Sequence, residues 1–177
     1  MREKVSDHLD KKYLISVDAD KSELNENIRC ARTLLESFPD MSIVIRRNVL
    51  EFQFKNPEYL INGEIGDRKG IHSERGIADA FKRGVEQGCR VIVLDLDMHM
   101  NSQLLHPNQI AKHLLWRPDF SEAAIHLCYV VYRGRAVEVR SDMRTREEIA
   151  TFCNSTKILK GSTKKAEAFA SAFVLPF

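Results

Sequence analysis

The chain has 177 residues, of which 44% are hydrophobic, and this is enough to build the core of a single domain. Its 27 basic and 25 acidic residues give a formal net charge of +2, so the total charge is no evidence for nucleic-acid binding. No apolar segment approaches the length of a membrane-spanning helix, the N-terminus has no signal-like pattern, and the four cysteines form no CxxC pair. We therefore expect a reduced, cytoplasmic protein with no zinc site and no contact with a membrane.

The first predicted element is a helix. Asp20 or Ser22 can cap its start, and Pro39 stops it after Phe38. Residues 42–49 then place apolar side chains alternately on two faces, which predicts a strand. The apolar stripe of the helix consists of Leu24, Ile28, Ala31, Leu35 and Phe38.

A tight hairpin follows the first strand. Asn62-Gly63 is the preferred pair for a two-residue type I′ turn, and apolar residues flank it on both sides. Paired positions in such a hairpin sum to a constant, so two carboxylates are predicted to lie opposite one another. The predicted pairs are Ile61 with Glu64, Leu60 with Ile65, Tyr59 with Gly66, and Glu58 with Asp67.

The opposed carboxylates of Glu58 and Asp67 need a cation, because like charges across an antiparallel pair repel. Lys69 is two residues beyond Asp67, so its side chain leaves the same face of the strand. Magnesium prefers oxygen ligands and typically takes one or two carboxylates with waters and phosphate oxygens. We therefore expect Mg²⁺ or Mn²⁺ at Glu58 and Asp67, with Lys69 orienting or deprotonating a water or neutralising charge as a phosphodiester is cleaved. An exposed hairpin with a surface ion cluster is the alternative interpretation.

A second helix and a buried strand complete the pattern. Ser73 can cap the helix, and Gly88 ends it. Residues 91–96 are almost continuously apolar, which is typical of a strand covered on both faces. Asp95 and Asp97 alternate at its end, and they either point carboxylates toward a metal or mark where the strand reaches solvent. The buried side of the helix is predicted to hold Ile77, Ala80, Phe81, Gly84 and Val85.

Residues 98–177 are predicted to elaborate this core. A helix is expected to begin near Pro107, and residues 125–140 predict a second hairpin with Arg133-Gly134 at its turn. The last stretch combines a basic link with an apolar, aromatic end. This end favours packing on the domain, self-association or docking onto a partner such as a cognate inhibitor.

The predicted order helix-strand-strand-strand-helix-strand carries two short motifs. Pro57-Glu58 opens the second strand, and Asp67-Arg68-Lys69 lies on the third. This arrangement resembles the PD-(D/E)xK superfamily of restriction-endonuclease-like nucleases. The resemblance implies an α/β fold with a mixed sheet flanked by helices. It also implies metal binding by Glu58, Asp67 and the backbone carbonyl of Arg68, with Lys69 assisting the water.

The resemblance covers about residues 22–97 of a single domain that spans residues 1–177. Gln87, near the end of the second helix, matches a polar residue that many relatives place beside the site. Glu36 or Glu26 on the first helix would supply a further acidic ligand.

A second resemblance belongs to a different mechanistic class. The same hairpin, followed by a helix ending in E-Q-G and by V-I-V-L-D-L, is similar to toxin and phage-associated domains of the barnase–EndoU–colicin–RelE ribonuclease fold. Those enzymes need no metal. This resemblance implies that His72, Lys69, Arg68, Glu74 and Arg140 move protons and hold the scissile phosphate.

The expected function is therefore cleavage of nucleic acid by a metal-dependent nuclease. Arg68 and Arg75 are expected to bind phosphate, because they lie beside the predicted site and a guanidinium group matches phosphate geometry. The toxin-like resemblance favours RNA, including tRNA, and a toxin or mobile-element context, whereas the restriction-like core favours DNA. The alternatives are a metal-independent ribonuclease and a nuclease-like scaffold that binds without catalysis.

Overall fold

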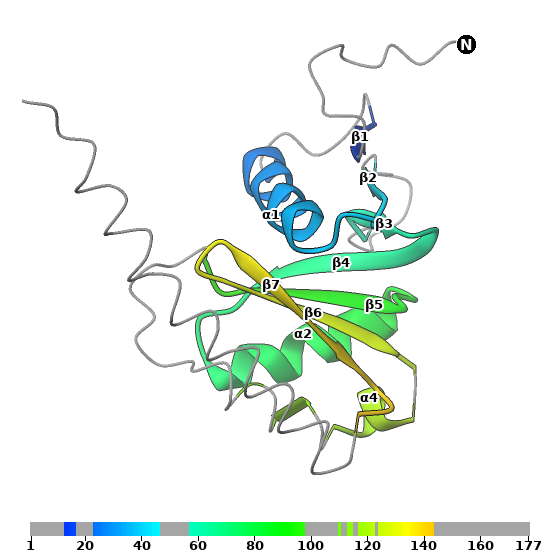
Figure 1. The fold of residues 1–177 in the computed structure, drawn as a ribbon. Helices are drawn as coiled ribbons and strands as arrows, with labels where there is room; N and C mark the ends of the chain where they lie inside the picture. The colour runs from blue at the N-terminus through cyan, green and yellow to red at the C-terminus, as the bar shows by residue number, and fades with distance from the viewer. Residues whose placement is uncertain are drawn as a thin grey trace, which may run out of the picture.

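The fold is a mixed sheet with helices on both faces. The computed structural model describes residues 13–16, 23–46, 57–97, 110, 113–114, 117–122 and 124–143. They form a seven-stranded sheet in the order β1 to β7, with α1 and α2 on opposite faces (Figure 1). The elements are β1 Tyr13–Ile15, α1 Leu24–Ser37, β2 Ile43–Ile45, β3 Tyr59–Ile61, β4 Glu64–Gly70, α2 Glu74–Glu86, β5 Val91–Asp95, α4 Pro118–Ser121, β6 Leu127–Tyr132 and β7 Arg135–Arg140. The expected α/β fold, its core order and its C-terminal hairpin are confirmed.

The strand directions determine which residues share an edge of the sheet. β2, β3 and β4 are antiparallel neighbours, β4, β5 and β6 are parallel, and β7 returns antiparallel to β6. The carboxyl ends of β4 and β5 therefore lie beside the start of β3, which Glu58 precedes. β1 was not predicted, because its three residues carry no measurable periodicity. It pairs parallel with β2 at the end of the sheet.

Both predicted hairpins are confirmed. Asn62 and Gly63 have φ values of 50° and 85°, and Arg133 and Gly134 have φ values of 51° and 68°. Two consecutive positive φ values are the signature of a type I′ turn. The observed pairs between β3 and β4 are Ile61 with Glu64, Leu60 with Ile65 and Tyr59 with Gly66, as the turn predicts.

The face covered by α1 has a core that differs in detail from the predicted stripe. Cys30 and Leu34 are completely buried, whereas Ile28 and Phe38 are only partly buried. Cys30 and Leu34 therefore belong to the centre of the buried face of α1, and Ile28 and Phe38 lie toward its margin. Asn27, a polar residue, also faces the interior.

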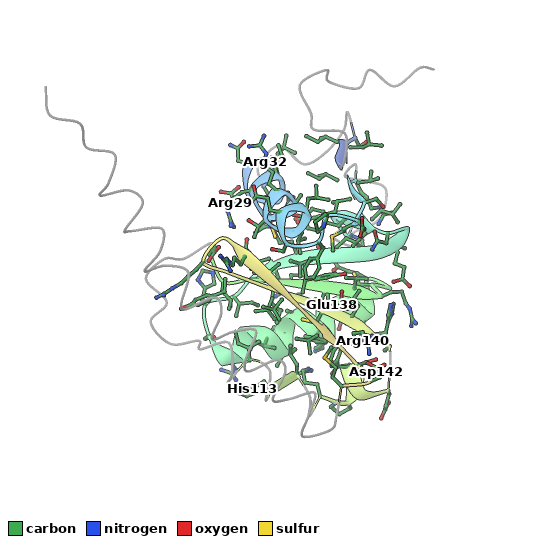
Figure 2. All side chains as sticks on the ribbon, viewed as in Figure 1. Arg29, Arg32, His113, Glu138, Arg140 and Asp142 are labelled. Carbon is green, nitrogen blue, oxygen red and sulfur yellow. The ribbon has the colours of Figure 1, made fainter. Side chains whose placement is uncertain are left out.

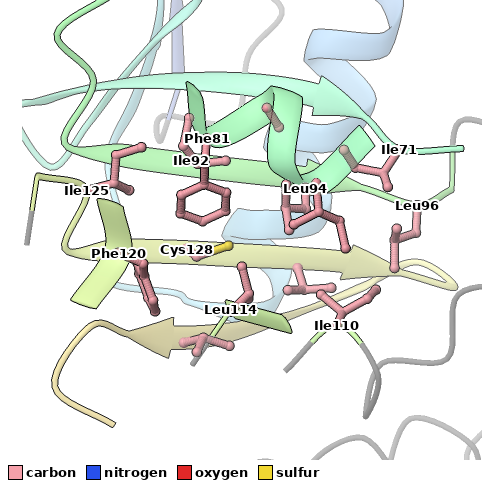
Figure 3. Close-up of a cluster of buried hydrophobic side chains, with 14 of the residues drawn as sticks. Ile71, Phe81, Ile92, Leu94, Leu96, Ile110, Leu114, Phe120, Ile125 and Cys128 are labelled. Atoms are coloured by element: carbon pink, nitrogen blue, oxygen red, sulfur yellow. The ribbon is translucent and has the colours of Figure 1, made fainter. Parts of the chain in front are cut away.

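The face covered by α2 has the core shown in Figure 3, where Phe81 packs against the side chains of β5 and β6. Ser73 caps α2 by accepting a hydrogen bond from the backbone N–H of Gly76, as expected. Ile77, Ala80 and Phe81 are buried as predicted. Val85 was predicted wrongly, because its side chain is 43% exposed on the outer side of the helix.

A tight approach of α2 to the sheet gives a stability prediction at Gly84. A Cβ atom there would lie 2.5 Å from Cδ1 of Ile92 and 3.2 Å from Cδ1 of Ile125, so these two fully buried side chains would have to shift within the core. We expect Gly84→Ala to lower the free energy of unfolding by about 1–3 kcal/mol, despite the helix propensity of alanine. Gly76→Ala is the matched control in the same helix. Its Cβ would have no neighbour closer than 3.9 Å, so a gain of up to about 1 kcal/mol is expected. Urea unfolding followed by circular dichroism measures both, and equal effects would contradict the prediction.

Several predictions fall on residues outside the described part of the chain. They concern the capping by Asp20 or Ser22, the end of the first strand beyond residue 46, the helix start at Pro107 and the C-terminal stretch. Within the part that the structure describes, no helix is long and apolar enough to cross a membrane.

Candidate functional site

The centre of the candidate site is an ion pair on β4. Asp67 and Lys69 are two residues apart on one strand and share a face, and Lys69 Nζ contacts Asp67 Oδ2. The Asp67 side chain is 2% exposed and that of Lys69 is 19% exposed. Lys69 is therefore the member of this pair that a ligand can contact from solvent, while Asp67 lies behind it in the interior.

Glu58 joins this pair from the start of β3. Its backbone N–H donates to Asp67 Oδ1 over 3.4 Å, so the two acidic residues are neighbours, as the hairpin register predicts. The Glu58 side chain turns differently, however. Its Oε2 lies 3.8 Å from Arg68 Nε, whereas Asp67 contacts Lys69. Glu58, Asp67 and Lys69 are therefore neighbours, but the carboxylate of Asp67 pairs with Lys69 and that of Glu58 with Arg68.

The protonation of both carboxyl groups is shifted by burial. The pKa of Glu58 is raised to about 8, first by burial, then by a hydrogen bond with Glu23 and by the charge of Asp67. The positive charge of Arg68 opposes this shift. Burial also raises the pKa of Asp67, and Lys69 opposes it. Glu58 Oε2 is buried and accepts no hydrogen bond within the described part of the chain. An additional cation would therefore stabilise the charged forms of both acidic groups.

The shifted pKa of Glu58 predicts a pH-dependent stability in the absence of metal. The unfolded chain has a carboxyl pKa near 4.5 and the folded chain one near 8, so the folded state binds more protons between these values. The stabilising effect is fully present below the unfolded pKa and is lost as pH rises through the folded pKa. We expect Glu58→Gln to remove this loss, which amounts to at most roughly 1.4 kcal/mol for each pH unit.

Urea unfolding in the presence of EDTA, at about pH 5.5, 7 and 8.5, measures this effect. Glu86→Gln, at an exposed position on α2, is the control and should follow the wild type. A wild-type protein whose stability rises across this interval, relative to Glu58→Gln, would contradict the prediction.

Arg68 has a different role from the predicted one. Its side chain is 1% exposed and points toward α1. Nε donates to Asn27 Oδ1 over 2.6 Å, Nη1 to Asp95 Oδ2 over 3.2 Å, and Nη2 to Glu23 Oε2 over 3.1 Å. The prediction that Arg68 grips phosphate is therefore wrong, because its guanidinium group is enclosed and bonded to protein acceptors.

The acidic residue that α1 contributes near the site is Glu23 rather than Glu26 or Glu36. Glu23 is the N-cap residue of α1 and bonds Arg68. Glu36 is exposed in the last turn, nine residues beyond Asn27 and thus about 14 Å further along the helix axis. The prediction of Glu36 as a ligand is not supported for this reason, and no contact with another described residue places Glu26 at the site.

Asp95 and Asp97 have structural roles that the sequence left open. Asp95 is fully buried and pairs with both Arg68 and Arg29, so the interpretation that it marks the exposed end of a strand is wrong. Asp97 accepts hydrogen bonds from the backbone N–H groups of Arg133 and Gly134 and so holds the second hairpin turn. Two features of the sequence could have indicated the partners of Arg68. They are Asn27 within the apolar face of the first helix and Asp95 at the end of an apolar strand.

The remaining candidate residues lie around α2. His72 is exposed in the loop before it, and Arg75 is exposed in its first turn. Glu74 is its first residue, and the Glu74 side chain is outside the described part. Gln87 is the C-cap residue, more than three turns from Arg75. The structure therefore puts Arg75 and Gln87 at opposite ends of α2, so they do not form one cluster.

Arg140 does not approach the candidate site. It ends β7, opposite Leu127 on β6, and pairs with Asp142 at the surface (Figure 2). β7 is separated from β4 by two strands, a distance of about 14 Å across the sheet. Its predicted role beside Lys69 is contradicted by this placement.

The cysteines next to these charged groups are not suited to nucleophilic chemistry. Burial raises the pKa of both Cys30 and Cys89 to about 12, so neither is a thiolate near neutral pH. The chemistry available at the site therefore comes from its carboxylates and from Lys69.

No family model, curated protein or solved structure matches this chain. Its own topology and the contacts of Glu58, Asp67 and Lys69 are therefore the basis for a functional proposal.

Proposed function

We propose that this protein is a metal-dependent nuclease that cleaves phosphodiester bonds of nucleic acid. The observation that carries the proposal is the ion pair of Asp67 and Lys69 on β4, with the backbone N–H of Glu58 on the Asp67 carboxylate. These residues lie in a core of the order α1-β2-β3-β4-α2-β5, which supports the resemblance to PD-(D/E)xK nucleases.

The donor set fits a hard divalent cation. Glu58 and Asp67 are adjacent carboxyl residues, and each has a raised pKa because burial leaves its negative charge poorly compensated. A bound Mg²⁺ or Mn²⁺ would supply Lewis-acid polarisation of the phosphate. No group of three or more His, Cys, Asp or Glu side chains that could hold a metal occurs among the described residues. Waters and substrate oxygens would complete the coordination, as is usual for magnesium.

The chain's own groups supply the remaining functions. Lys69 is partly exposed beside Asp67, where its ammonium group stabilises negative charge on a phosphate or orients a water. Arg75, exposed in the first turn of α2, is the arginine left to bind phosphate now that Arg68 is enclosed.

Cleavage of labelled tRNA, single-stranded DNA and duplex DNA tests the proposal. We expect the purified protein to cut at least one of them with Mg²⁺ or Mn²⁺ and to be inactive with EDTA, and Glu58→Gln and Asp67→Asn to be inactive under all conditions. Glu86→Gln is the matched acidic control, because it lies exposed at the end of α2. The substrate that is cut assigns the substrate class.

Two other outcomes would replace this proposal. RNA cleavage that persists in EDTA would favour the metal-independent ribonuclease, although Arg68 is enclosed and Arg140 is distant, which leaves Lys69 and His72 as its main candidates. A folded protein that cuts none of the substrates would favour the scaffold that binds without catalysis.

A further inference from the structure

Arg68 is a buried charged side chain near the candidate site that has several fixed partners. Each of its three donor groups has a separate acceptor, and these acceptors come from the N-cap of α1, the first half of α1 and the end of β5. The plane of the guanidinium group is therefore set by two elements that are far apart in the sequence. Such a fork can adopt only one orientation.

The anchors of Arg68 are themselves held in place. Asp95 is fully buried and pairs with Arg29 as well as Arg68. Asn27 is 2% exposed, and its backbone carbonyl accepts a hydrogen bond from the Tyr59 hydroxyl over 2.7 Å. Because Tyr59 begins β3, this bond ties α1 to the strand that Glu58 precedes.

The Glu58 carboxyl group has two side-chain partners: a hydrogen bond with Glu23, which itself bonds Arg68, and the nearby guanidinium group of Arg68. It lies one residue outside the pairs between β3 and β4, so strand geometry does not dictate its direction. Its buried Oε2 accepts no hydrogen bond within the described residues and lies 3.8 Å from Arg68 Nε. Arg68 is thus the cation that pairs with this oxygen.

We propose that Arg68 is a positioning residue, which sets the direction of the Glu58 carboxylate and is itself held by Asn27 and Asp95. The proposal rests on the proposed function in so far as Glu58 binds the metal. The contact of Arg68 with Glu58 is an ion pair at 3.8 Å and not a hydrogen bond. Outer groups that orient metal ligands typically change metal affinity 10–100-fold when they are removed, and we take this range for Arg68. We expect Arg68 to act on metal binding in this way without touching metal or substrate.

Two readouts test the proposal, and the first needs no metal. Crystal structures of the wild type, Arg68→Met and Asn27→Ala give the position of the Glu58 carboxylate directly. We expect this carboxylate to move by more than about 1 Å in both variants, while Asp67 and Lys69 stay paired. Asn27→Ala retains the pair of Arg68 with Asp95, so it serves if Arg68→Met does not fold. A Glu58 carboxylate that keeps its place would overturn the proposal.

The second readout is the affinity for Mn²⁺, measured by electron paramagnetic resonance of the free ion. We expect affinity to fall about 10–100-fold in Arg68→Met and Asn27→Ala. Arg68→Lys keeps the charge but loses the fork, so it should fall as well. Arg140→Met is the control, because Arg140 is 53% exposed, pairs with Asp142 and lies on β7, away from the site. The Mn²⁺ affinity of this variant should equal that of the wild type.

The outcomes separate the two proposals. If the wild type binds no Mn²⁺ but Glu58 moves in the variants, the metal-dependent function fails and the positioning role stands. Full affinity in Arg68→Lys would mean that charge alone suffices. An equal loss in Arg140→Met would mean that removal of any positive charge from the protein lowers the affinity. Either of these results would overturn the positioning role.

Discussion

Lys69→Ala is expected to reduce metal-dependent cleavage by roughly 10²–10³-fold, the usual effect of removing one group that stabilises developing charge. Lys69 is the cation in contact with Asp67, and its side chain remains 19% exposed, so a phosphate can reach it. Single-turnover cleavage of the preferred substrate at saturating Mg²⁺ measures the effect on the chemical step.

The matched control for this variant is Lys82→Ala, since Lys82 is exposed on the outer side of α2. Its cleavage rate should equal that of the wild type. Thermal unfolding shows whether the Lys69 variant is folded at the assay temperature. A folded Lys69→Ala protein that cleaves at the wild-type rate would exclude Lys69 from the reaction.

Asp95→Ala is expected to produce the largest loss of stability, about 3–5 kcal/mol. Its carboxylate is fully buried and is shared by Arg29 and Arg68, and the Arg68 side chain has 1% exposure. Removal of this carboxylate leaves a buried guanidinium group with less negative charge around it. Breaking such a pair from one side is costly because the other charge stays desolvated.

Urea unfolding at neutral pH measures the stability of this variant. Asp142→Ala is the control, because Asp142 and its partner Arg140 are both more than half exposed, and such pairs contribute about 0–1 kcal/mol. An Asp95→Ala protein within about 1 kcal/mol of the wild type would mean that the arginines find other acceptors or water.

The elements that were predicted correctly are those with local causes. The Asn62-Gly63 turn sets the register of β3 and β4 residue by residue, and this register brings Glu58 next to Asp67. Strand alternation alone places Lys69 on the face of Asp67. The cap at Ser73 likewise depends on residues within one helical turn.

The incorrect predictions concern side-chain directions that depend on distant segments. Arg68 was predicted to face a phosphate, but its acceptors come from α1 and from the end of β5. The stripe of α1 was predicted from spacing alone, whereas packing against the sheet turned Asn27 inward. The residues next to Arg68 in the sequence do not indicate that it bonds Asn27 or Asp95.

The sequence by itself determined the order of the elements from α1 to β5, both hairpin turns and the adjacency of Glu58, Asp67 and Lys69, because capping, turn type and strand period act over a few residues. The tertiary structure decided how the charges are shared. In the folded protein Asp95 and Arg68 are buried as a pair, and Glu23 accepts a hydrogen bond from Arg68. The Glu58 carboxylate lies against Arg68. The physical reason is desolvation: a buried charge must lie against an opposite charge or a hydrogen-bonding partner, and only the packing of α1 on the sheet determines which partners are within reach.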